Sequence, residues 1–233
     1  MIDPAIAPLV AVARALGSLT AEVVFIGGAI APLLQTEAPF PRVRPTVDVD
    51  GVVASATYGD VERLHEQLRA RGFREQVSAR HVHRWLAPDS TPFDLVPIGD
   101  HLGGTGNPHD VEVAATAVRH ELEHGVTIRH ASAAGFLALK WGAFGDRGRR
   151  DPLASHDLED ILALVASRPG VVEEMRTAPP GLRALVAEWS GWLLATEYAD
   201  DLLASHLNNA TNVGATVKLV RERIAGMAPG EAA

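Results

Sequence analysis

Two aspartates two positions apart are the most specific chemical feature of the sequence. Asp48 and Asp50 lie in the stretch 46–53, in which apolar valines alternate with the two acids. This alternation predicts a strand, and a strand directs every second side chain to the same face of a sheet. Two carboxylates a few ångströms apart repel each other, and a shared hard cation such as Mg²⁺ relieves that repulsion. The pair therefore predicts a metal site, with a solvent-facing strand edge as the alternative.

A third carboxylate, Asp94, lies in another strand-like run, residues 93–98. Its neighbours Phe93 and Leu95 are apolar, and a carboxylate among core residues usually has a partner. Beside a metal-holding pair, Asp94 would act as a general base toward an attacking hydroxyl or would bind a second metal. For Asp94 alone, a position at the mouth of a hairpin with no chemical role is the alternative.

A glycine pair precedes these acids. The short run 22–26 predicts a strand that ends at Gly27 and Gly28, and Ala29 begins a predicted helix. Glycine lets a backbone approach a ligand closely, and the N–H groups at a helix start can bind phosphate, although a tight turn alone would look the same. Phosphoryl or nucleotidyl transfer requires mainly positioning and charge neutralisation, which a glycine pair, paired aspartates and a third aspartate supply together.

Later in the chain, Lys140 stands among apolar residues in a predicted helix. Its stem would be packed and its ammonium available to a phosphate, or the residue simply snorkels at a helix edge. Asp157 and Asp160 are three positions apart, on one face of the predicted helix 156–166. They either support the chemistry or interact favourably with the helix dipole.

The elements that would position these residues change character along the chain. Strands are predicted at 22–26, 46–53, 80–86 and 93–98, and helices at 3–16, 29–34, 58–71, 132–144, 156–166, 182–194, 198–207 and 217–225. The segment 111–128 is ambiguous. Strands before helices predict an α+β fold, with a small mixed sheet in residues 1–130 and a helical portion in residues 131–226.

Composition limits the alternatives. The formal net charge of −8 disfavours a broad nucleic-acid surface, although Arg147, Arg149 and Arg150 form a local basic cluster. Zero cysteines exclude disulfides and thiolate metal sites, so carboxylates and imidazoles remain as ligands. No apolar run approaches the roughly 20 residues that span a bilayer, and no secretory signal is visible. We expect a cytoplasmic protein that does not enter membranes.

Two sequence blocks resemble a known family. Phe25-Ile26-Gly27-Gly28-Ala29, followed by Arg44-Pro45-Thr46-Val47-Asp48-Val49-Asp50, resembles the signature of DNA-polymerase-β-type nucleotidyltransferases. Leu137-Ala138-Leu139-Lys140-Trp141, Arg147 and the block from Ser155 to Ile161 resemble the AbiEii-type branch, which includes the MenT toxins of type IV toxin–antitoxin systems. The blocks bracket residues 23–164, and the stretch between Gly28 and Asp48 is longer and richer in proline than the general motif.

The resemblance implies roles for particular residues. Gly27, Gly28 and Ala29 would bind the triphosphate of a nucleoside triphosphate, and Asp48 and Asp50 would hold Mg²⁺ or Mn²⁺. Lys140 would contact phosphate, and Asp157 would support Lys140 or act near the nucleophile. Asp94 lacks a strict equivalent in some members.

The resemblance also implies partners. The branch suggests transfer of a nucleoside monophosphate to an RNA hydroxyl such as a tRNA 3′ end, and a cognate antitoxin as a protein partner. The acidic balance of the chain favours instead a small-molecule nucleotidyltransferase of the antibiotic-modifying kind. A third alternative is a nucleotide-binding relative that has lost turnover, against which the intact Asp48, Asp50 and Lys140 argue.

Overall fold

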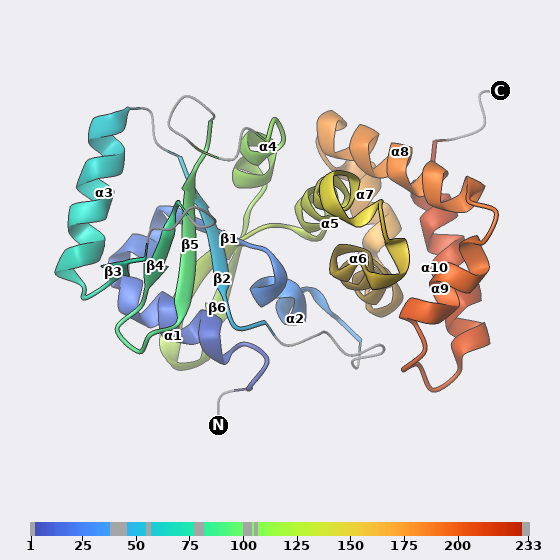
Figure 1. The fold of residues 1–233 in the computed structure, drawn as a ribbon, viewed down its shortest axis with the longest axis horizontal. Coiled ribbons are helices and arrows are strands. Elements are labelled where there is room, and N and C mark those ends of the chain that lie inside the picture. Colours follow the sequence, from blue (N-terminus) through green and yellow to red (C-terminus); the bar gives the residue numbers. More distant parts are fainter. Residues whose placement is uncertain are drawn as a thin grey trace. The chain divides into compact units, whose positions relative to one another are not determined.

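The computed structural model describes residues 3–37, 46–54, 57–76, 82–99, 104 and 107–229 (Figure 1). Arg44 and Pro45, which belong to the family-like motif, lie outside the described residues. The chain divides into two compact units. The first comprises the described residues of Met1–Pro32 and Pro45–Ser132, and the second those of Leu33–Arg44 and Ala133–Ala233. A mixed sheet in the first unit and helices in the second confirm the predicted α+β class.

The first unit is built on a seven-stranded sheet with the order β3-β4-β5-β2-β1-β7-β6. Its strands are β1 (Val23–Ile26), β2 (Val49–Val53), β3 (Arg74–Glu75), β4 (Arg84–Leu86), β5 (Pro92–Pro97), β6 (Val118–Leu122) and β7 (Val126–His130). Strand β1 runs antiparallel to β2 and parallel to β7, and β2 runs parallel to β5. The pairs β3–β4, β4–β5 and β6–β7 are antiparallel, so the sheet is mixed.

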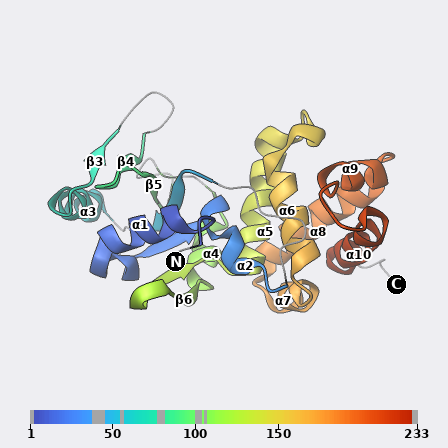
Figure 2. The ribbon, with the colours of Figure 1, turned by 90° about the horizontal axis from the view of Figure 1, so that it is seen from below.

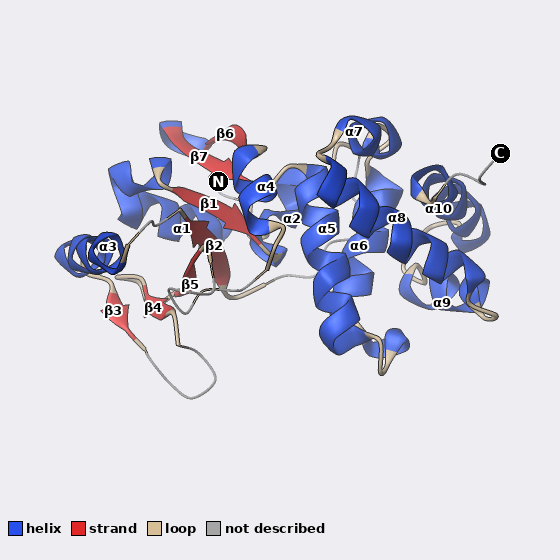
Figure 3. Cartoon of the chain, turned by 90° about the horizontal axis from the view of Figure 1, so that it is seen from above, coloured by secondary structure: helices blue, strands red, loops and turns tan. Residues whose placement is uncertain are grey.

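Helices cover both faces of this sheet. The helices of the first part of the chain are α1 (Ala7–Leu16), α2 (Ala31–Leu34), α3 (Tyr58–Ala70) and α4 (Asp110–Ala115). Helices α1 and α3 lie on one side of the sheet and α4 on the other (Figure 3). Figure 2 shows α3 beside β3 and β4 at one end of the sheet, where the ring of His65 lies 5.0 Å from that of Trp85.

The sheet face toward α3 is tightly filled. Phe93 lies between two other rings, with centroids 6.3 Å from Phe25 and 6.0 Å from Phe73. A Cβ on Gly51 would lie 2.8 Å from Val23 and 3.2 Å from Phe93, so β2 needs glycine at this point. Close packing of this kind holds β1, β2 and β5 in a fixed register, which positions the acids on the opposite face.

The second unit is helical. Its helices are α5 (Ala133–Ala143), α6 (His156–Ser167), α7 (Val171–Thr177), α8 (Pro180–Ala195), α9 (Ala199–His206) and α10 (Val213–Met227). Helix α5 packs against α6, α7 and α8, and α10 packs against α6 to α9. The rings of Trp141 and Trp189 stack 6.1 Å apart, and Phe144 meets both edge-to-face at 5.6 Å.

Most predicted elements form close to their expected positions, with several differences. Strand β3 was not predicted, and β4 begins only at Arg84, because residues 82–83 of the predicted strand 80–86 form a turn. Helix α4 and the hairpin β6–β7 occupy the segment that was ambiguous in sequence. Helix α7, with seven residues, was not predicted. The predicted helix 29–34 is a 3₁₀ turn, Gly28–Ile30, followed by the short α2. Each helix within the described part of the chain is too short or too polar to cross a membrane.

Candidate active site

One row of residues crosses four strands of the first unit. Arg84 on β4 is opposite Asp94 on β5, Asp94 is opposite Asp50 on β2, and Asp50 is opposite Ile26 on β1. Directly opposed residues project to the same face of a sheet, so the two acids and the arginine are neighbours. Asp48 comes two residues before Asp50, just before β2 begins, and keeps the same direction by strand alternation. We call Asp48, Asp50, Asp94 and Arg84 the aspartate cluster.

Gly27 closes this row beside Asp50. It follows the last residue of β1 and has φ 71°, a conformation that favours glycine. A Cβ at this position would collide with the carboxylate of Asp50. Backbone conformation and space therefore both require glycine here, and the Asp50 carboxylate lies directly against the Gly27 backbone.

Gly28 and Ala29 form the 3₁₀ turn that follows. A Cβ on Gly28 would have only ordinary contacts, the nearest being Thr46 Cβ at 3.6 Å. The side chain of Ala29 is buried, with 2% exposed, so only its backbone could face a ligand. Of the predicted triphosphate-binding residues, Gly27 is the one whose lack of a side chain brings backbone next to a predicted metal ligand.

The carboxylates of the cluster remain reachable from solvent. Asp48 has 39% of its side chain exposed and Asp94 has 21%. The Thr46 hydroxyl donates to Asp48 Oδ1 at 2.8 Å, which orients one oxygen of that carboxylate. Thr46 thereby has a structural reason to precede the pair at this spacing.

Arg84 binds two of the three carboxylates. Its Nε and Nη2 donate to Asp94 Oδ1 and Oδ2 at 2.7 and 2.6 Å, and Nη2 is 3.4 Å from Asp48 Oδ2. Only 14% of the Arg84 side chain is exposed. The hydrogen bonds to Asp94 raise the pKa of Arg84 further above its ordinary value, and the charges of Asp94, Asp48 and Asp50 act in the same direction against burial. The guanidinium is therefore permanently charged.

The oxygen ligands fit a metal that is bound together with a substrate. Within the described residues, no group of three or more Asp, Glu, His or Cys side chains could hold a metal ion by itself. Mg²⁺, however, is commonly bound through one or two carboxylates while substrate phosphates and water complete its shell. Asp48 and Asp50 supply two such carboxylates next to the partly exposed Gly27, and they are the residues that would hold the ion.

A second charged group lies wholly in the helical unit. Lys140 Nζ on α5 is 3.2 Å from Asp157 Oδ1 and 2.6 Å from Asp160 Oδ2, both on α6. Arg147 donates to both oxygens of Asp157, at 2.8 Å from Nε and 3.0 Å from Nη2. We call Lys140, Arg147, Asp157 and Asp160 the lysine cluster. Its carboxylates are buried, with 5% of Asp157 and 3% of Asp160 exposed.

Burial and pairing act against each other in the lysine cluster. Burial lowers the pKa of Lys140, but Asp160 and Asp157 outweigh burial and leave that pKa above its ordinary value. Burial likewise raises the pKa of Asp157, but Arg147 and Lys140 leave it below its ordinary value. Both groups are therefore charged near neutral pH. The Lys140 ammonium, expected to be available to a phosphate, is already bound to two carboxylates in this structure.

A π-helical segment, Phe144–Gly148, connects Lys140 to Arg147. The wider turn presents Arg147 to the start of α6, and such segments are frequent at functional sites. A Cβ on Gly145 would lie 2.6 Å from Trp189, so the aromatic cluster fixes this backbone. Arg147, Arg149 and Arg150 are exposed, and the Arg149 guanidinium lies 5.9 Å from the Trp189 ring.

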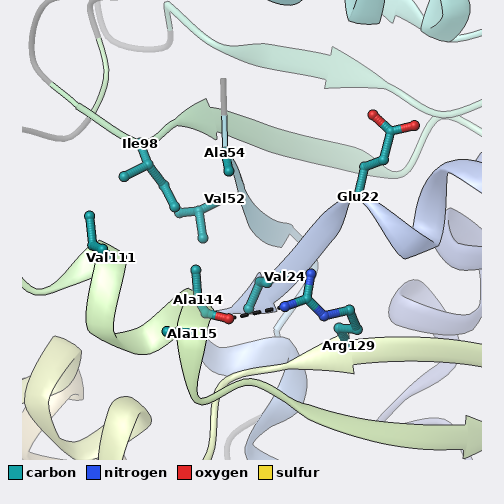
Figure 4. A pocket seen from close by; sticks show the side chains of 9 residues that line it. All are labelled: Glu22, Val24, Val52, Ala54, Ile98, Val111, Ala114, Ala115 and Arg129. Carbon is teal, nitrogen blue, oxygen red and sulfur yellow. Dashed lines mark hydrogen bonds between the residues drawn. The ribbon is translucent and has the colours of Figure 1, made fainter. Parts of the chain in front are cut away.

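The first unit also contains two hollows. A pocket of about 480 Å³ lies between the sheet and α4 (Figure 4). It includes Val52, two residues after Asp50 on the same strand, and therefore lies on the face that carries the acids. Its lining residues are Glu22, Val24, Val52, Ala54, Ile98, Val111, Ala114, Ala115 and Arg129. A second hollow, of about 590 Å³, is lined in part by Arg14, Arg119 and Arg129.

The structure thus brings Asp48, Asp50, Asp94 and Gly27 together in one unit, and Lys140 with Asp157 in the other. Arg84 was not predicted from sequence. The sequence held one indication of such a residue. If the predicted strands 80–86 and 93–98 form an antiparallel hairpin, some residue of the first strand must lie opposite Asp94. His81, which shares one face of the predicted strand 80–86 with His83 and is expected to be half-exposed there, lies outside the described residues.

The fold has a counterpart among solved structures. The chain is similar to an antigenic nucleotidyltransferase-like protein from Paracoccidioides brasiliensis, with a TM-score of 0.51 and 19% sequence identity. The similarity covers 90% of this chain and 95% of that protein. No protein-family model and no curated protein matches the chain. At this identity the similarity establishes a nucleotidyltransferase-like fold, which confirms that part of the resemblance seen in sequence.

Proposed function

We propose that the chain is a nucleotidyltransferase that uses Mg²⁺, or Mn²⁺, to move a nucleoside monophosphate from a nucleoside triphosphate to an acceptor hydroxyl. One observation carries the proposal. In a nucleotidyltransferase-like fold, Asp48, Asp50 and Asp94 meet on one sheet face, and the Asp50 carboxylate lies against Gly27. The arrangement places metal ligands beside a backbone segment that a triphosphate can approach closely. Reactions of triphosphates need both a metal ion and such positioning.

The reaction is an in-line displacement at the α-phosphorus. The acceptor oxygen forms a bond to phosphorus, the bond from that phosphorus to the bridging oxygen breaks, and pyrophosphate leaves. The hydroxyl proton is released to solvent water. A bound divalent ion would neutralise charge on the triphosphate and on the departing pyrophosphate. The chain itself contributes the positions of Asp48 and Asp50, which β2 fixes, and the backbone approach at Gly27.

We propose an RNA acceptor, such as a tRNA 3′ end, and an AbiEii-like toxin role with a cognate antitoxin. Two basic regions support an RNA acceptor in this acidic chain. Arg147, Arg149 and Arg150 form one. The other is the hollow with Arg119 and Arg129, which stand directly opposite each other on β6 and β7. Opposed like charges are destabilising, and phosphate groups of a ligand would relieve the repulsion.

A small cationic acceptor is the second candidate, and the pocket under α4 favours it. That pocket is mostly apolar, is lined by Glu22 as well as Arg129, and lies on the aspartate-bearing face (Figure 4). Convergent apolar walls with a few polar groups are typical of small-molecule sites.

The deciding experiment incubates the full chain with each α-labelled nucleoside triphosphate, Mg²⁺ and either total tRNA or a set of cationic antibiotics. We expect label from one nucleotide in tRNA, and none with the Asp50→Asn variant. Label in an antibiotic instead would establish the second candidate. A folded protein that labels neither acceptor with any nucleotide would contradict transferase activity and leave the non-catalytic relative.

A further inference from the structure

The position of Arg84 changes what the third aspartate can do. Arg84 and Asp94 are opposed in the β4–β5 register and form a two-point contact, with both oxygens of Asp94 engaged. A planar guanidinium matches a carboxylate in this geometry, and such charge-assisted pairs are among the stronger polar contacts in proteins. While the contact persists, Asp94 has little capacity left to bind a metal or to accept a proton.

The charge of the cluster leads to the same conclusion. Three carboxylates carry three negative charges, and Arg84 supplies one positive charge in direct contact with two of them. A second divalent ion would have to displace Arg84 from Asp94 or share a site with a permanent cation 14% exposed to solvent.

We infer that Arg84 takes the place of a second metal ion: it holds Asp94 as its counter-ion and restricts metal binding by the protein to one ion on Asp48 and Asp50. The inference rests on the proposed function, because it assumes that the aspartate pair binds a divalent metal. Arg84 is then a positioning residue. It orients Asp94 and, through its contact of 3.4 Å with Asp48, one metal ligand.

A purely structural role for Arg84 makes different predictions. Arg84 would then only join β4 to β5, and its removal would lower stability without altering the number of bound metal ions. The two roles are separated by counting ions, since the count depends on free carboxylates rather than on strand pairing.

The test measures Mn²⁺ binding to the full chain by electron paramagnetic resonance and calorimetry, with a non-hydrolysable nucleoside triphosphate present. We expect one Mn²⁺ per wild-type chain. In Arg84→Gln, a second Mn²⁺ should bind, or the first should bind about tenfold more tightly, because a nearby positive charge is gone and Asp94 is released. Arg84→Gln combined with Asp94→Asn should return to one ion. Arg69→Gln, which removes an exposed arginine paired with Glu62 and Glu75, is the matched control.

Asp94→Asn alone provides a test that does not depend on the folding of the Arg84 variant. If Asp94 is no metal ligand, this variant still binds one Mn²⁺, with an affinity within about threefold of wild type. Loss of Mn²⁺ binding in Asp94→Asn would overturn the inference, as would a folded Arg84→Gln protein with unchanged stoichiometry and affinity. Absence of Mn²⁺ binding in the wild type would instead overturn the metal assignment of the proposed function.

Discussion

The aspartate cluster and the lysine cluster use the same kinds of side chain in opposite surroundings. In the first, Asp48 and Asp94 are 39% and 21% exposed on one face of the sheet, and Asp50 lies against the Gly27 backbone. In the second, Asp157 and Asp160 are almost completely buried between two helices. A ligand can exchange with exposed carboxylates at little desolvation cost, whereas buried carboxylates require permanent partners.

The partners differ in the same way. Arg84 binds both oxygens of Asp94 but makes only one longer contact with Asp48, at 3.4 Å, so Asp48 keeps an exposed carboxylate for a ligand. Lys140 and Arg147 together match the charge of Asp157 and Asp160. The carboxylates of the aspartate cluster are therefore reachable by a ligand, whereas those of the lysine cluster are buried against two cations. This difference suggests a binding role for the first and a large structural contribution from the second.

The largest expected effect tests the aspartate cluster. Asp50→Asn should lower the rate of nucleotide transfer by about 100-fold or more, because a metal ligand is lost. Asp48→Asn should act in the same way. The melting temperature should stay the same or rise, since repulsion between carboxylates falls. Transfer of labelled nucleotide and thermal unfolding measure the two quantities, with Glu66→Gln on the exposed face of α3 as control. Full activity in either variant at saturating Mg²⁺ would remove the metal assignment.

The next largest effect tests the lysine cluster. Lys140→Met should reduce the free energy of unfolding by about 3 kcal/mol, because it removes the cation paired with buried Asp160 and leaves Asp157 with Arg147 alone of its two cationic partners. The triple variant Lys140→Met, Asp157→Asn, Asp160→Asn should recover much of the loss. Urea unfolding measures both proteins. A Lys140→Met protein of normal stability that uses the nucleoside triphosphate poorly would show instead that Lys140 acts mainly on phosphate, as the family resemblance implies.

The lysine cluster also predicts how stability depends on pH. The pKa of Asp157 is lowered by folding, so its contribution is present above its ordinary pKa and is lost as the pH falls through the folded value. The pKa of Lys140 is raised, so its contribution is lost as the pH rises through a value above the ordinary one. Stability from this cluster should be constant between these limits. Unfolding of wild type and Asp157→Asn across acidic pH measures the first limb, which should be smaller in the variant.

The spacing of apolar residues, alternating in strands and every three to four residues in helices, was enough to predict much of the fold. Alternation in 46–53 located β2, and helical spacing located α3, α5, α6 and α8 within a few residues. The elements of segment 110–130 could not be predicted in this way, because α4 has only six residues and β6 is exposed at the sheet edge. Neither has enough buried positions to show a period. Strand β6 depends on its pairing with β7, and α4 accepts a hydrogen bond from Arg129 of β7 at Ala114, so contacts with β7 rather than local preference fix both elements.

Residue types located the acids, but not their counter-ions. Asp48, Asp50 and Asp94 were recognisable because carboxylates are unusual in apolar strands. Arg84 was not, since its importance comes from the β4–β5 register, which places it opposite Asp94. The pairing of Lys140 with Asp160 has a similar origin in the packing of α5 on α6. Register and helix packing are tertiary properties, and no local pattern contains them.

A smaller effect examines the contact between Gly27 and Asp50. Gly27→Ala introduces a Cβ that collides with the carboxylate, in a residue with φ 71°. Gly17→Ala is the matched control, because Gly17 has φ 56° but open space around the new Cβ. Strain at positive φ should destabilise both variants by about 1 kcal/mol. Only Gly27→Ala should also weaken Mn²⁺ binding and transfer, since only there is a metal ligand displaced. Equal effects of the two substitutions on Mn²⁺ binding would mean that Asp50 does not hold the ion.

The smallest effect concerns the acceptor and the exposed part of the lysine cluster. Changing Arg147, Arg149 and Arg150 to glutamine should weaken tRNA binding and lower the salt dependence of its affinity by a slope of up to about 2, because fewer counterions are released. Nucleotide binding should change little. A variant with Arg176, Arg183 and Arg221 changed to glutamine loses the same charge from the same unit and should bind tRNA as wild type does.

Since Arg147 also contacts Asp157, the single variant Arg147→Gln separates a loss of stability from a loss of RNA contacts. If the first triple variant binds tRNA normally while Arg14→Gln with Arg119→Gln does not, the RNA contacts lie on the first unit. If neither set changes binding or transfer to tRNA, the acceptor is not recognised through these basic residues, and the small-molecule candidate gains support.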